Sequence, residues 1–487
     1  MRYKSATLGA LIIIVTIVKM VLIIGSPKLI ALSNNWDFIR TESCMGLWQN
    51  YGDGTAKTDA HLKAPVNSLV LDRGVKMDQC VVSIDSAFPY IVSRFHKVND
   101  HVDFHAIGYL RLASVFIALG FLLSAARGSK QRLVIAAIFM AIFGDIAYLL
   151  YFNTLYNEFS DFLGVFICTA SLWMIWTGST KSIRKSSLTL MAGVFLICMS
   201  KEQYSALGIL FSVVGALLLF VRLRLARLAS GLLAVGVFSA LSFSMINQSD
   251  FGLPSGIKLA NITDAVLGEV LPYATNRDQA LKTLNLPPEC EKGIGDTWYT
   301  PGVPENHPCP SLINVHRMNL IPLFIKQPKT FFYPIRDALW HAYPVPDHHY
   351  GLFEYPGDAD SLRYRLVKAT SLTTYMNRLP KMAFRWIMTV AMAIGVVASI
   401  WCLFTIRRTD KYGSKLLWAI GGVTLFYVMV SSVFGDGIAD TSRHAILWPF
   451  GITVQIMGTL LFLAERFAVS KSTVRAELPE VNHVPAG

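Results

Sequence analysis

Long apolar runs recur along most of this sequence, and they constrain its fold more than any other feature. A helix needs about 20 mostly apolar residues to cross the hydrocarbon core of a bilayer. Hydrophobic residues make up 53% of the chain and charged residues only 16%, which excludes a soluble globular protein. We therefore expect an all-α polytopic membrane protein with two long loops on its outer face. It has about ten predicted transmembrane helices, at residues 6–25, 107–126, 133–152, 162–178, 188–200, 205–221, 229–246, 383–406, 416–434 and 445–463.

Basic residues mark one side of the predicted bundle. If the N-terminus with Arg2 and Lys4 is cytoplasmic, every second short loop is also cytoplasmic, and those loops are basic, whereas 153–161 contains no Lys or Arg. This distribution follows the positive-inside rule, so both termini are expected in the cytoplasm. The excess of 44 Lys and Arg over 32 Asp and Glu is then a consequence of topology. We expect membrane lipid as a partner, and no nucleic acid.

This topology divides the chain into consecutive parts. Residues 26–106 and 247–382 are rich in Pro, Gly, Asp and aromatic residues and have only short apolar stretches, so we expect both outside the membrane. In order, the parts are a first transmembrane helix (1–25), an outer loop (26–106), membrane helices 2–7 (107–246), an outer, periplasmic loop domain (247–382), membrane helices 8–10 (383–463) and a cytoplasmic tail (464–487).

Four of the seven cysteines lie in the two outer loops. Cys44 and Cys80 share the first loop, and Cys290 and Cys309 share the second. Disulfides form and persist in oxidising compartments. Since each of these cysteines has only one possible partner in its own loop, we predict one bridge in each loop. The alternative is four free thiols.

Unusual polar residues collect at the outer ends of the predicted helices. The segment YFNTLYNEFSDF (151–162) holds far more polar residues than a minimal turn requires, and SNNWDFIRTESC (33–44), MSKEQYSALG (199–208) and FGDGIADTSRHAILWP (434–449) are similar. Charges at a membrane edge are costly and are more often functional than decorative. The candidate site residues in these segments are Asp37, Arg40, Glu42, Asn153, Asn157, Glu158, Asp161, Lys201, Glu202, Asp440, Arg443 and His444.

These residue types suit transfer of a group from a phosphate-linked donor. Lys201 can hold a phosphate as a point charge, and Arg443 offers a bidentate contact with phosphate oxygens. A carboxylate near those cations can act as general base on an acceptor hydroxyl. Asp37 is the first candidate for this base, with Glu42 and Glu158 as alternatives.

Each candidate taken singly also has a structural explanation. Asp37 can be a solvated loop residue, and Glu158 and Asp161 can be helix-start carboxylates stabilised by the macrodipole. Lys201 can extend its ammonium group to the interface, and Arg443 can pair with an acidic neighbour of its own segment. Their joint location on one side of the membrane is what favours a functional site.

The layout resembles the GT-C class of polyprenyl-phosphate-sugar-dependent glycosyltransferases. In that class a first helix is followed by a long outer loop whose early acidic residue looks like the catalytic base, and Asp37 in NNWDF is the matching position. The segments YFNTLYNEFSDF, SKEQYSALG and GDGIADTSRH look like outer-loop segments of bacterial hexose transferases of this kind. The resemblance implies transfer of a sugar from a polyprenyl-phosphate donor to a glycan or lipid-linked acceptor at the outer face of a bacterial inner membrane.

Metal use is predicted to be absent. The common metal-dependent branch of the GT-C class carries an Asp-x-Asp type motif, whereas this first loop has Asp37 alone at the expected place. We therefore expect no metal and no other cofactor. The stretch HKVNDHVDFH offers an alternative, because His96, His101, Asp103 and His105 are suitable ligands for zinc or manganese.

Two other functions that involve lipid-linked sugars remain open at this stage. A flippase or transporter would use the same outer cations but would also need polar residues along a path through both leaflets. An O-antigen ligase or polymerase would transfer glycan chains instead of single sugars. The sequence contains no G-x-x-x-x-G-K-[ST], H-E-x-x-H or G-x-S-x-G motif. The sequence therefore lacks the motifs that usually mark an ATP-driven pump, a zinc protease and an ordinary serine hydrolase.

Overall fold

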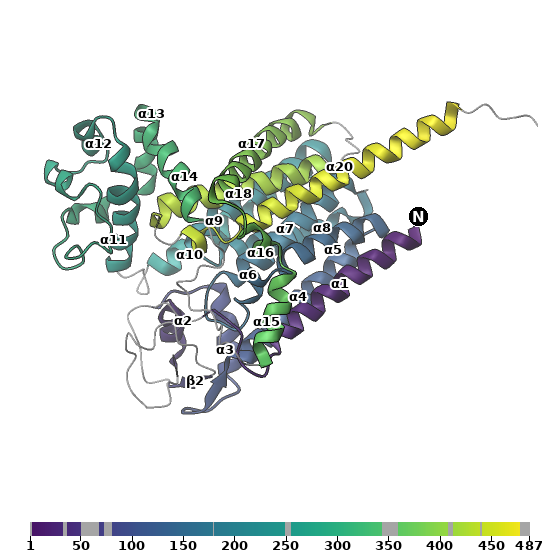
Figure 1. The fold of residues 1–487 in the computed structure, drawn as a ribbon, viewed down its shortest axis with the longest axis horizontal. Coiled ribbons are helices and arrows are strands. Elements are labelled where there is room, and N and C mark those ends of the chain that lie inside the picture. The colour runs from purple at the N-terminus through teal and green to yellow at the C-terminus, as the bar shows by residue number, and fades with distance from the viewer. Residues whose placement is uncertain are drawn as a thin grey trace, which may run out of the picture.

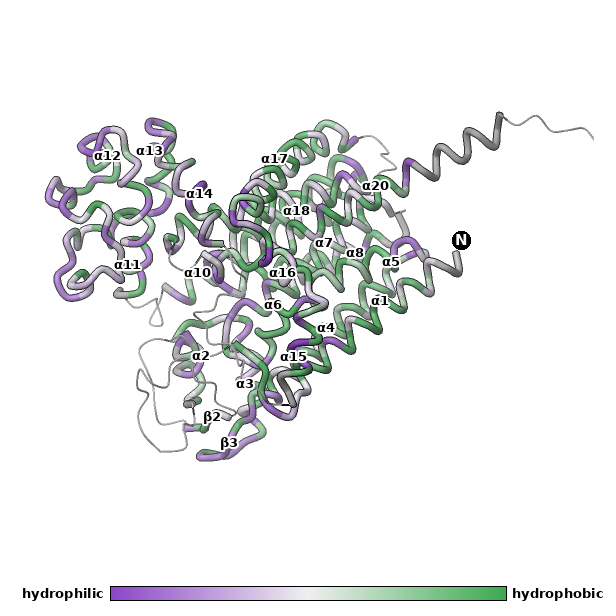
Figure 2. Tube along the Cα trace, in the orientation of Figure 1, coloured by the Kyte–Doolittle hydropathy of each residue, from purple (hydrophilic) through white to green (hydrophobic). Residues whose placement is uncertain are grey.

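The long helices of this chain form a bundle that carries two polar regions at one of its ends (Figure 1). The computed structural model describes residues 2–32, 37–49, 68–72, 80–178, 180–248, 255–342, 359–407, 413–438 and 441–477. The N-terminus and the C-terminal part of the last long helix lie at the opposite end from the polar regions. We call the end with the polar regions the loop end. Apolar residues dominate the bundle, and hydrophilic residues are denser at the loop end (Figure 2).

Eight helices in the described part of the chain are long and apolar enough to cross a membrane. This confirms the predicted all-α polytopic membrane fold, although the number is smaller than the ten predicted spans. The helices that contain these spans are α1 (Arg2–Ile24), α4 (Phe104–Ala125), α7 (Phe159–Thr177), α9 (Glu202–Leu217) with its π-helical extension η3 (Leu218–Arg222), α10 (Ala226–Gln248), α17 (Lys381–Thr405), α18 (Ser414–Asp436) and α20 (Trp448–Glu477).

The other two predicted spans are also helices, but their bounds differ from the prediction. The predicted helix 133–152 is instead α5 (Ser129–Phe143), followed by the short α6 (Ile146–Leu149). The break occurs because Asp145 accepts a hydrogen bond from the backbone N–H of Ala147 and so caps a new helix. The predicted helix 188–200 is α8 (Thr180–Cys198), which begins earlier and therefore includes a basic first part.

The helix α7 lies at the centre of the bundle. Every residue from Phe159 to Trp176 is buried, and α7 contacts α4, α5, α8, α9 and α18. It packs closely on α8, since a Cβ atom at Gly193 would lie only 3.0 Å from the carbonyl oxygen of Gly164. The N-terminus of α7 is therefore held in the middle of the loop end.

The first polar region contains a small antiparallel sheet. Its order is β1-β2-β3, with Leu47 opposite Leu71 and Ser68 opposite Asp103. A disulfide joins Cys44 to Cys80, the pair predicted from the sequence. The elements are α2 (Phe38–Met45), β1 (Leu47–Gln49), β2 (Ser68–Leu71), η2 (Ile84–Ser86), α3 (Ala87–Ser93) and β3 (His101–Asp103).

The second polar region is a lobe of short helices. It contains the other predicted disulfide, between Cys290 and Cys309. Arg317 docks the lobe on the end of α18 by donating hydrogen bonds to the carbonyl oxygens of Phe434 (3.2 Å) and Gly435 (2.7 Å). The elements are α11 (Ser255–Thr263), η4 (Asp264–Val270), η5 (Leu271–Tyr273), α12 (Arg277–Thr283), η6 (Pro288–Gly293), η7 (Pro310–Asn314), η8 (Arg317–Asn319), α13 (Leu320–Lys326) and α14 (Lys329–His341).

The last part of the predicted loop 247–382 packs away from this lobe. Helices α15 (Ala359–Ala369) and α16 (Leu372–Met376) lie beside the bundle, where α15 contacts α1 and α6 (Figure 1). The Asp145 carboxylate accepts a hydrogen bond from the backbone N–H of Thr373 at 3.0 Å, and Lys19 Nζ donates to the carbonyl oxygen of Thr370 at 2.8 Å. These two charged residues therefore fasten the pair of short helices to the bundle.

Candidate functional site

Four segments that are distant in sequence meet at the loop end, around the N-terminus of α7. Asp37 immediately precedes α2, and Glu158 is the N-cap residue of α7. Lys201 is the N-cap residue of α9. The fourth segment is α19 (Thr441–His444), a single turn between α18 and α20. Helix termini thus bring these side chains into one place.

The four segments are joined by ion pairs. A terminal guanidinium nitrogen of Arg443 pairs with the Asp37 carboxylate, and Arg443 Nε lies 3.4 Å from Glu158 Oε1. Lys201 Nζ lies 3.2 Å from the same Glu158 oxygen, and Arg40 Nη2 lies 3.1 Å from Asp37 Oδ1. We call these five residues the ionic cluster. Arg443 thus pairs with carboxylates of two other segments, in α7 and before α2.

His444 extends this cluster as a neutral imidazole. Its Nδ1 atom lies 3.0 Å from Lys201 Nζ, and its Nε2 atom lies 3.1 Å from an Asp436 carboxylate oxygen. The same Nδ1 atom also lies 3.0 Å from Gln203 Oε1, so it faces both a donor and an acceptor. Burial, Lys201 and Arg443 hold the pKa of His444 well below its ordinary value of 6.5, so the imidazole is neutral.

The members of the ionic cluster differ in how far they are accessible. The side chains of Asp37 and Lys201 are 12% and 17% exposed, whereas those of Glu158 and Arg443 are 1% and 6% exposed. Burial alone would raise the pKa of Asp37 and of Glu158, but the neighbouring cations outweigh it and hold both pKa values below their ordinary range. Both carboxylates are therefore ionised, and the members that a ligand can reach are Arg40, which is 27% exposed, Lys201 and Asp37.

The other polar residues of YFNTLYNEFSDF do not join the cluster. Asn153 is buried and donates a hydrogen bond to the last carbonyl oxygen of α1 at 3.3 Å. Asn157 accepts a hydrogen bond from a threonine of α2 at 3.2 Å. Asp161 is fully buried and accepts a hydrogen bond from the hydroxyl of Ser200. These three side chains, predicted to contact substrate, hydrogen-bond to the protein itself; of this segment, Glu158 joins the cluster and the Tyr156 ring lies 5.1 Å from the Arg443 guanidinium.

The structure describes two of the three remaining candidates. Glu42 is buried within α2, and Glu202 is exposed in the first turn of α9. Asp440 lies outside the described residues.

Arg111, a residue that sequence analysis missed, organises the crowded segment. It is fully buried in α4 and donates hydrogen bonds to the carbonyl oxygens of residues 151, 152, 154 and 156 at 2.7–3.2 Å. It also lies 3.8 Å from Asp85, whose carboxylate accepts hydrogen bonds from the backbone and the hydroxyl of Ser160. A lone arginine in an apolar run was the signal that could have identified it.

The histidines of HKVNDHVDFH form separate pairs. His105 contacts Asp103 at 2.7 Å and the carbonyl oxygen of Ser26 at 2.9 Å, while His96 contacts the carbonyl oxygen of residue 92. His101 lies 3.3 Å from the hydroxyl of Ser68. Among the described residues, no group of three His, Cys, Asp or Glu side chains is placed to hold a metal ion.

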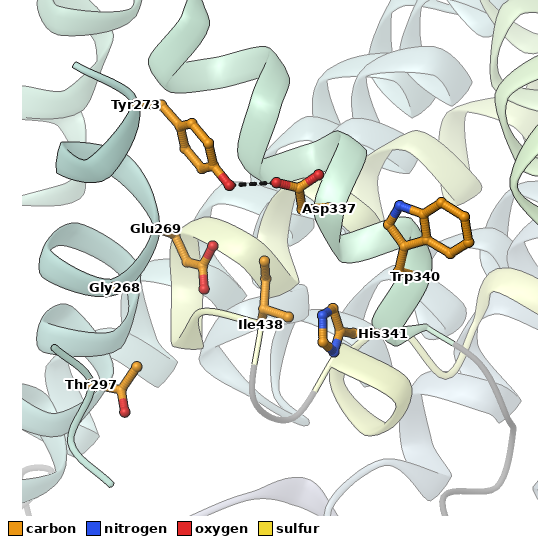
Figure 3. A pocket seen from close by; sticks show the side chains of 8 residues that line it. All are labelled: Gly268, Glu269, Tyr273, Thr297, Asp337, Trp340, His341 and Ile438. Carbon is orange, nitrogen blue, oxygen red and sulfur yellow. Dashed lines mark hydrogen bonds between the residues drawn. The ribbon is translucent and has the colours of Figure 1, made fainter. Parts of the chain in front are cut away.

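A cavity of about 700 Å³ opens where the lobe meets the bundle (Figure 3). Glu269 and Asp337 point into it from opposite sides, and Tyr273 donates a hydrogen bond to Asp337. Trp340 and His341 line the other end. The complete lining is Gly268, Glu269, Tyr273, Thr297, Asp337, Trp340, His341 and Ile438.

Glu269, which lines this cavity, is expected to make the stability of the folded protein depend on pH. Burial, followed by the charges of Asp337 and Asp264, raises the pKa of Glu269 to about 8 from its ordinary 4.5. Because the folded state holds this proton more tightly, the stabilising contribution is complete below 4.5 and is lost as the pH rises through about 8. We expect the thermal unfolding temperature of the purified protein to fall between about pH 5 and about pH 8.

Glu269→Gln is expected to reduce that fall, because glutamine does not titrate. Glu289→Gln, which changes an exposed glutamate of the same lobe, serves as the matched control and should decline like the wild type. Equal declines in the wild type and in Glu269→Gln would contradict the assignment.

The bundle, its eight candidate spans and the charges gathered at one end define an integral membrane protein with a polar site at the ends of its helices. The chain belongs to the family described as the YfdI N-terminal transmembrane domain, which it matches over residues 2–476. Comparison with curated proteins and with solved structures gives no match.

Proposed function

We propose that this protein is a membrane glycosyltransferase that transfers a sugar from a polyprenyl-phosphate donor to a cell-envelope glycan at the outer face of a bacterial inner membrane. The observation that carries the proposal is the ionic cluster, in which Lys201 and Arg443 meet Asp37 and Glu158 at the ends of membrane helices. Family membership and the resemblance to GT-C enzymes support the same class.

The two cations supply the contacts for the donor phosphate. A polyprenyl-phosphate sugar has its chain in the bilayer and its phosphate at the membrane edge. Lys201 is partly exposed, while the more deeply buried Arg443 shares the same Glu158 oxygen with it. Both cations stabilise the negative charge that develops on the phosphate oxygen as the bond to the sugar breaks.

Asp37 acts as the base in this scheme. It removes the proton from an acceptor hydroxyl as the hydroxyl oxygen bonds to the anomeric carbon of the donor sugar. The bond between that carbon and the phosphate oxygen breaks, and the polyprenyl phosphate leaves with the bonding electron pair. Asp37 is ionised before the reaction, as a base must be, and its side chain is accessible.

Arg443 connects donor binding with the basicity of Asp37. It pairs with Asp37 in the free protein and so keeps that carboxylate a weak base. A bound phosphate competes for the same guanidinium group, and this competition weakens its pairing with Asp37. Donor binding thereby raises the basicity of Asp37 at the moment when a base is needed.

Transfer of radiolabelled sugar tests the proposal directly. Purified protein in lipid is given a panel of polyprenyl-phosphate sugars and envelope polysaccharide, and label in the polysaccharide is counted. Asp37→Asn is expected to lower the rate of transfer about a hundredfold or more, because it removes the base. The matched control is Asp278→Asn, an exposed carboxylate on α12, which should transfer like the wild type.

Two outcomes would overturn the proposal. If folded Asp37→Asn protein kept full activity, Asp37 would not be the base. Failure of the wild type to transfer from any donor, while lipid-linked sugar crosses the bilayer in the same vesicles, would assign the protein to the flippase class. The size of the labelled product distinguishes single-sugar transfer from a ligase or polymerase.

A further inference from the structure

We infer that the cavity between the lobe and the bundle binds an uncharged saccharide portion of the acceptor glycan. This inference rests on the proposed function and deepens it, because the ionic cluster provides contacts for a donor phosphate, whereas the cavity offers an aromatic ring together with polar groups. A volume of about 700 Å³ suits a small ligand.

The lining of the cavity has the residue types that sugars need. Trp340 presents an apolar ring, which packs against the C–H face of a pyranose. Glu269, Asp337 and Thr297, which line the same cavity, offer oxygen atoms to sugar hydroxyls. Arg385 lies over the Trp340 ring, 5.0 Å from its centroid, and so helps to fix the orientation of the indole.

The charges around the cavity favour a neutral ligand over a charged one. An anionic ligand would be repelled by the Asp337 carboxylate, while Glu269, with a pKa of about 8, is protonated near neutral pH. A cationic ligand would have to compete with Arg336, which already pairs with Asp337 at 2.7 Å, and would face the nearby Arg385. A polyhydroxylated neutral group uses these carboxyl groups as hydrogen-bond partners without either conflict.

The cavity and the ionic cluster are joined by one turn after α18. Asp436 contacts His444 of the site, and Ile438, two residues later, lines the cavity and donates its backbone N–H to Glu269. Gly437 makes this turn with a φ of +75°, where a Cβ atom would also lie 2.8 Å from the Asp264 side chain. An acceptor held in the cavity is therefore next to the segment that carries the donor contacts.

Saccharide binding without turnover tests the inference. The full-length protein in lipid nanodiscs is titrated with neutral hexose tetrasaccharides, and with hexuronate-containing tetrasaccharides as the charged comparison, while binding is followed by calorimetry. We expect saturable binding of a neutral tetrasaccharide, weakened at least tenfold in Trp340→Ala. Trp340→Phe, which keeps a ring, should retain most of the affinity. Phe332→Ala, an exposed aromatic residue of the same helix that does not line the cavity, is the matched control and should bind like the wild type.

The outcomes separate this inference from the proposed function. If the wild type transfers sugar but binds no neutral tetrasaccharide, or if folded Trp340→Ala and Trp340→Phe both bind as well as the wild type, the inference is wrong and the transferase remains. If neutral tetrasaccharide is bound through Trp340 but no donor supports transfer, the saccharide site stands and the proposed function fails. Tighter binding of the hexuronate series would contradict the assignment of a neutral ligand.

Discussion

Replacing Arg111 by methionine is expected to destabilise the folded protein by about 3–5 kcal/mol. The substitution removes four hydrogen bonds to backbone carbonyl groups of the 151–156 segment and leaves the buried Asp85 without its cation. Methionine has a similar length, so the expected loss comes from unsatisfied polar groups and not from a cavity.

Thermal unfolding in detergent, followed by intrinsic fluorescence, measures this effect. Arg94→Met is the matched control, because Arg94 is exposed near the same region and its loss should leave the unfolding temperature nearly unchanged. In the double variant with Asp85→Asn, part of the stability should return, since the unpaired carboxylate is gone. Equal unfolding temperatures for Arg111→Met and the wild type would refute the role assigned to Arg111.

Replacing Arg443 by glutamine is expected to lower sugar transfer about a thousandfold. This residue pairs with both Asp37 and Glu158, and in the proposed reaction it also stabilises charge on the leaving phosphate. Glutamine removes the charge from all three interactions. Arg443→Lys should retain part of the activity, because a lysine keeps the charge but not the planar geometry that contacts two carboxylates.

Initial rates with the preferred donor check this expectation, and the unfolding temperature shows whether each variant is folded. Glu158→Gln combined with Arg443→Gln removes the buried carboxylate that the single change deprives of one of its two cations, Lys201 being the other, so it should recover part of the stability without recovering transfer. Arg227→Gln, an exposed arginine at the opposite end of the bundle, is the matched control. A folded Arg443→Gln protein with normal rates would remove Arg443 from the mechanism.

The membrane fold was predictable because apolar runs report local burial in lipid. Runs such as the one in α17 (Lys381–Thr405) are continuous, and the predicted bounds of 383–406 are close to those of the helix. The predicted bounds were wrong where a helix cap interrupts an apolar run. The chain around Asp145 is apolar enough to continue α5, but its carboxylate starts a new turn that is stabilised by contacts with residues of α16.

The site was predictable only in part. The sequence indicates on which side of the membrane a charged residue lies, but not which residues form ion pairs with one another. Lys201, Arg443 and Asp37 were expected on the same side, and the structure brings them together. The pairing of Arg443 with Asp37 and Glu158 depends on how α2, α7 and α19 pack. Nothing local distinguishes Glu158, which faces the cations, from Asp161, which faces Ser200.

The ionic cluster and the cavity differ in how their residues are distributed along the chain. Each ion pair between Asp37, Glu158, Lys201 and Arg443 joins widely separated segments, whereas seven of the eight cavity residues fall between Gly268 and His341. A chimera that exchanges the lobe of residues 255–342 between two members of the family therefore moves nearly the whole cavity and leaves the cluster intact. Recombination within this one stretch is a route by which ligand preference can diverge while the charged centre is inherited unchanged.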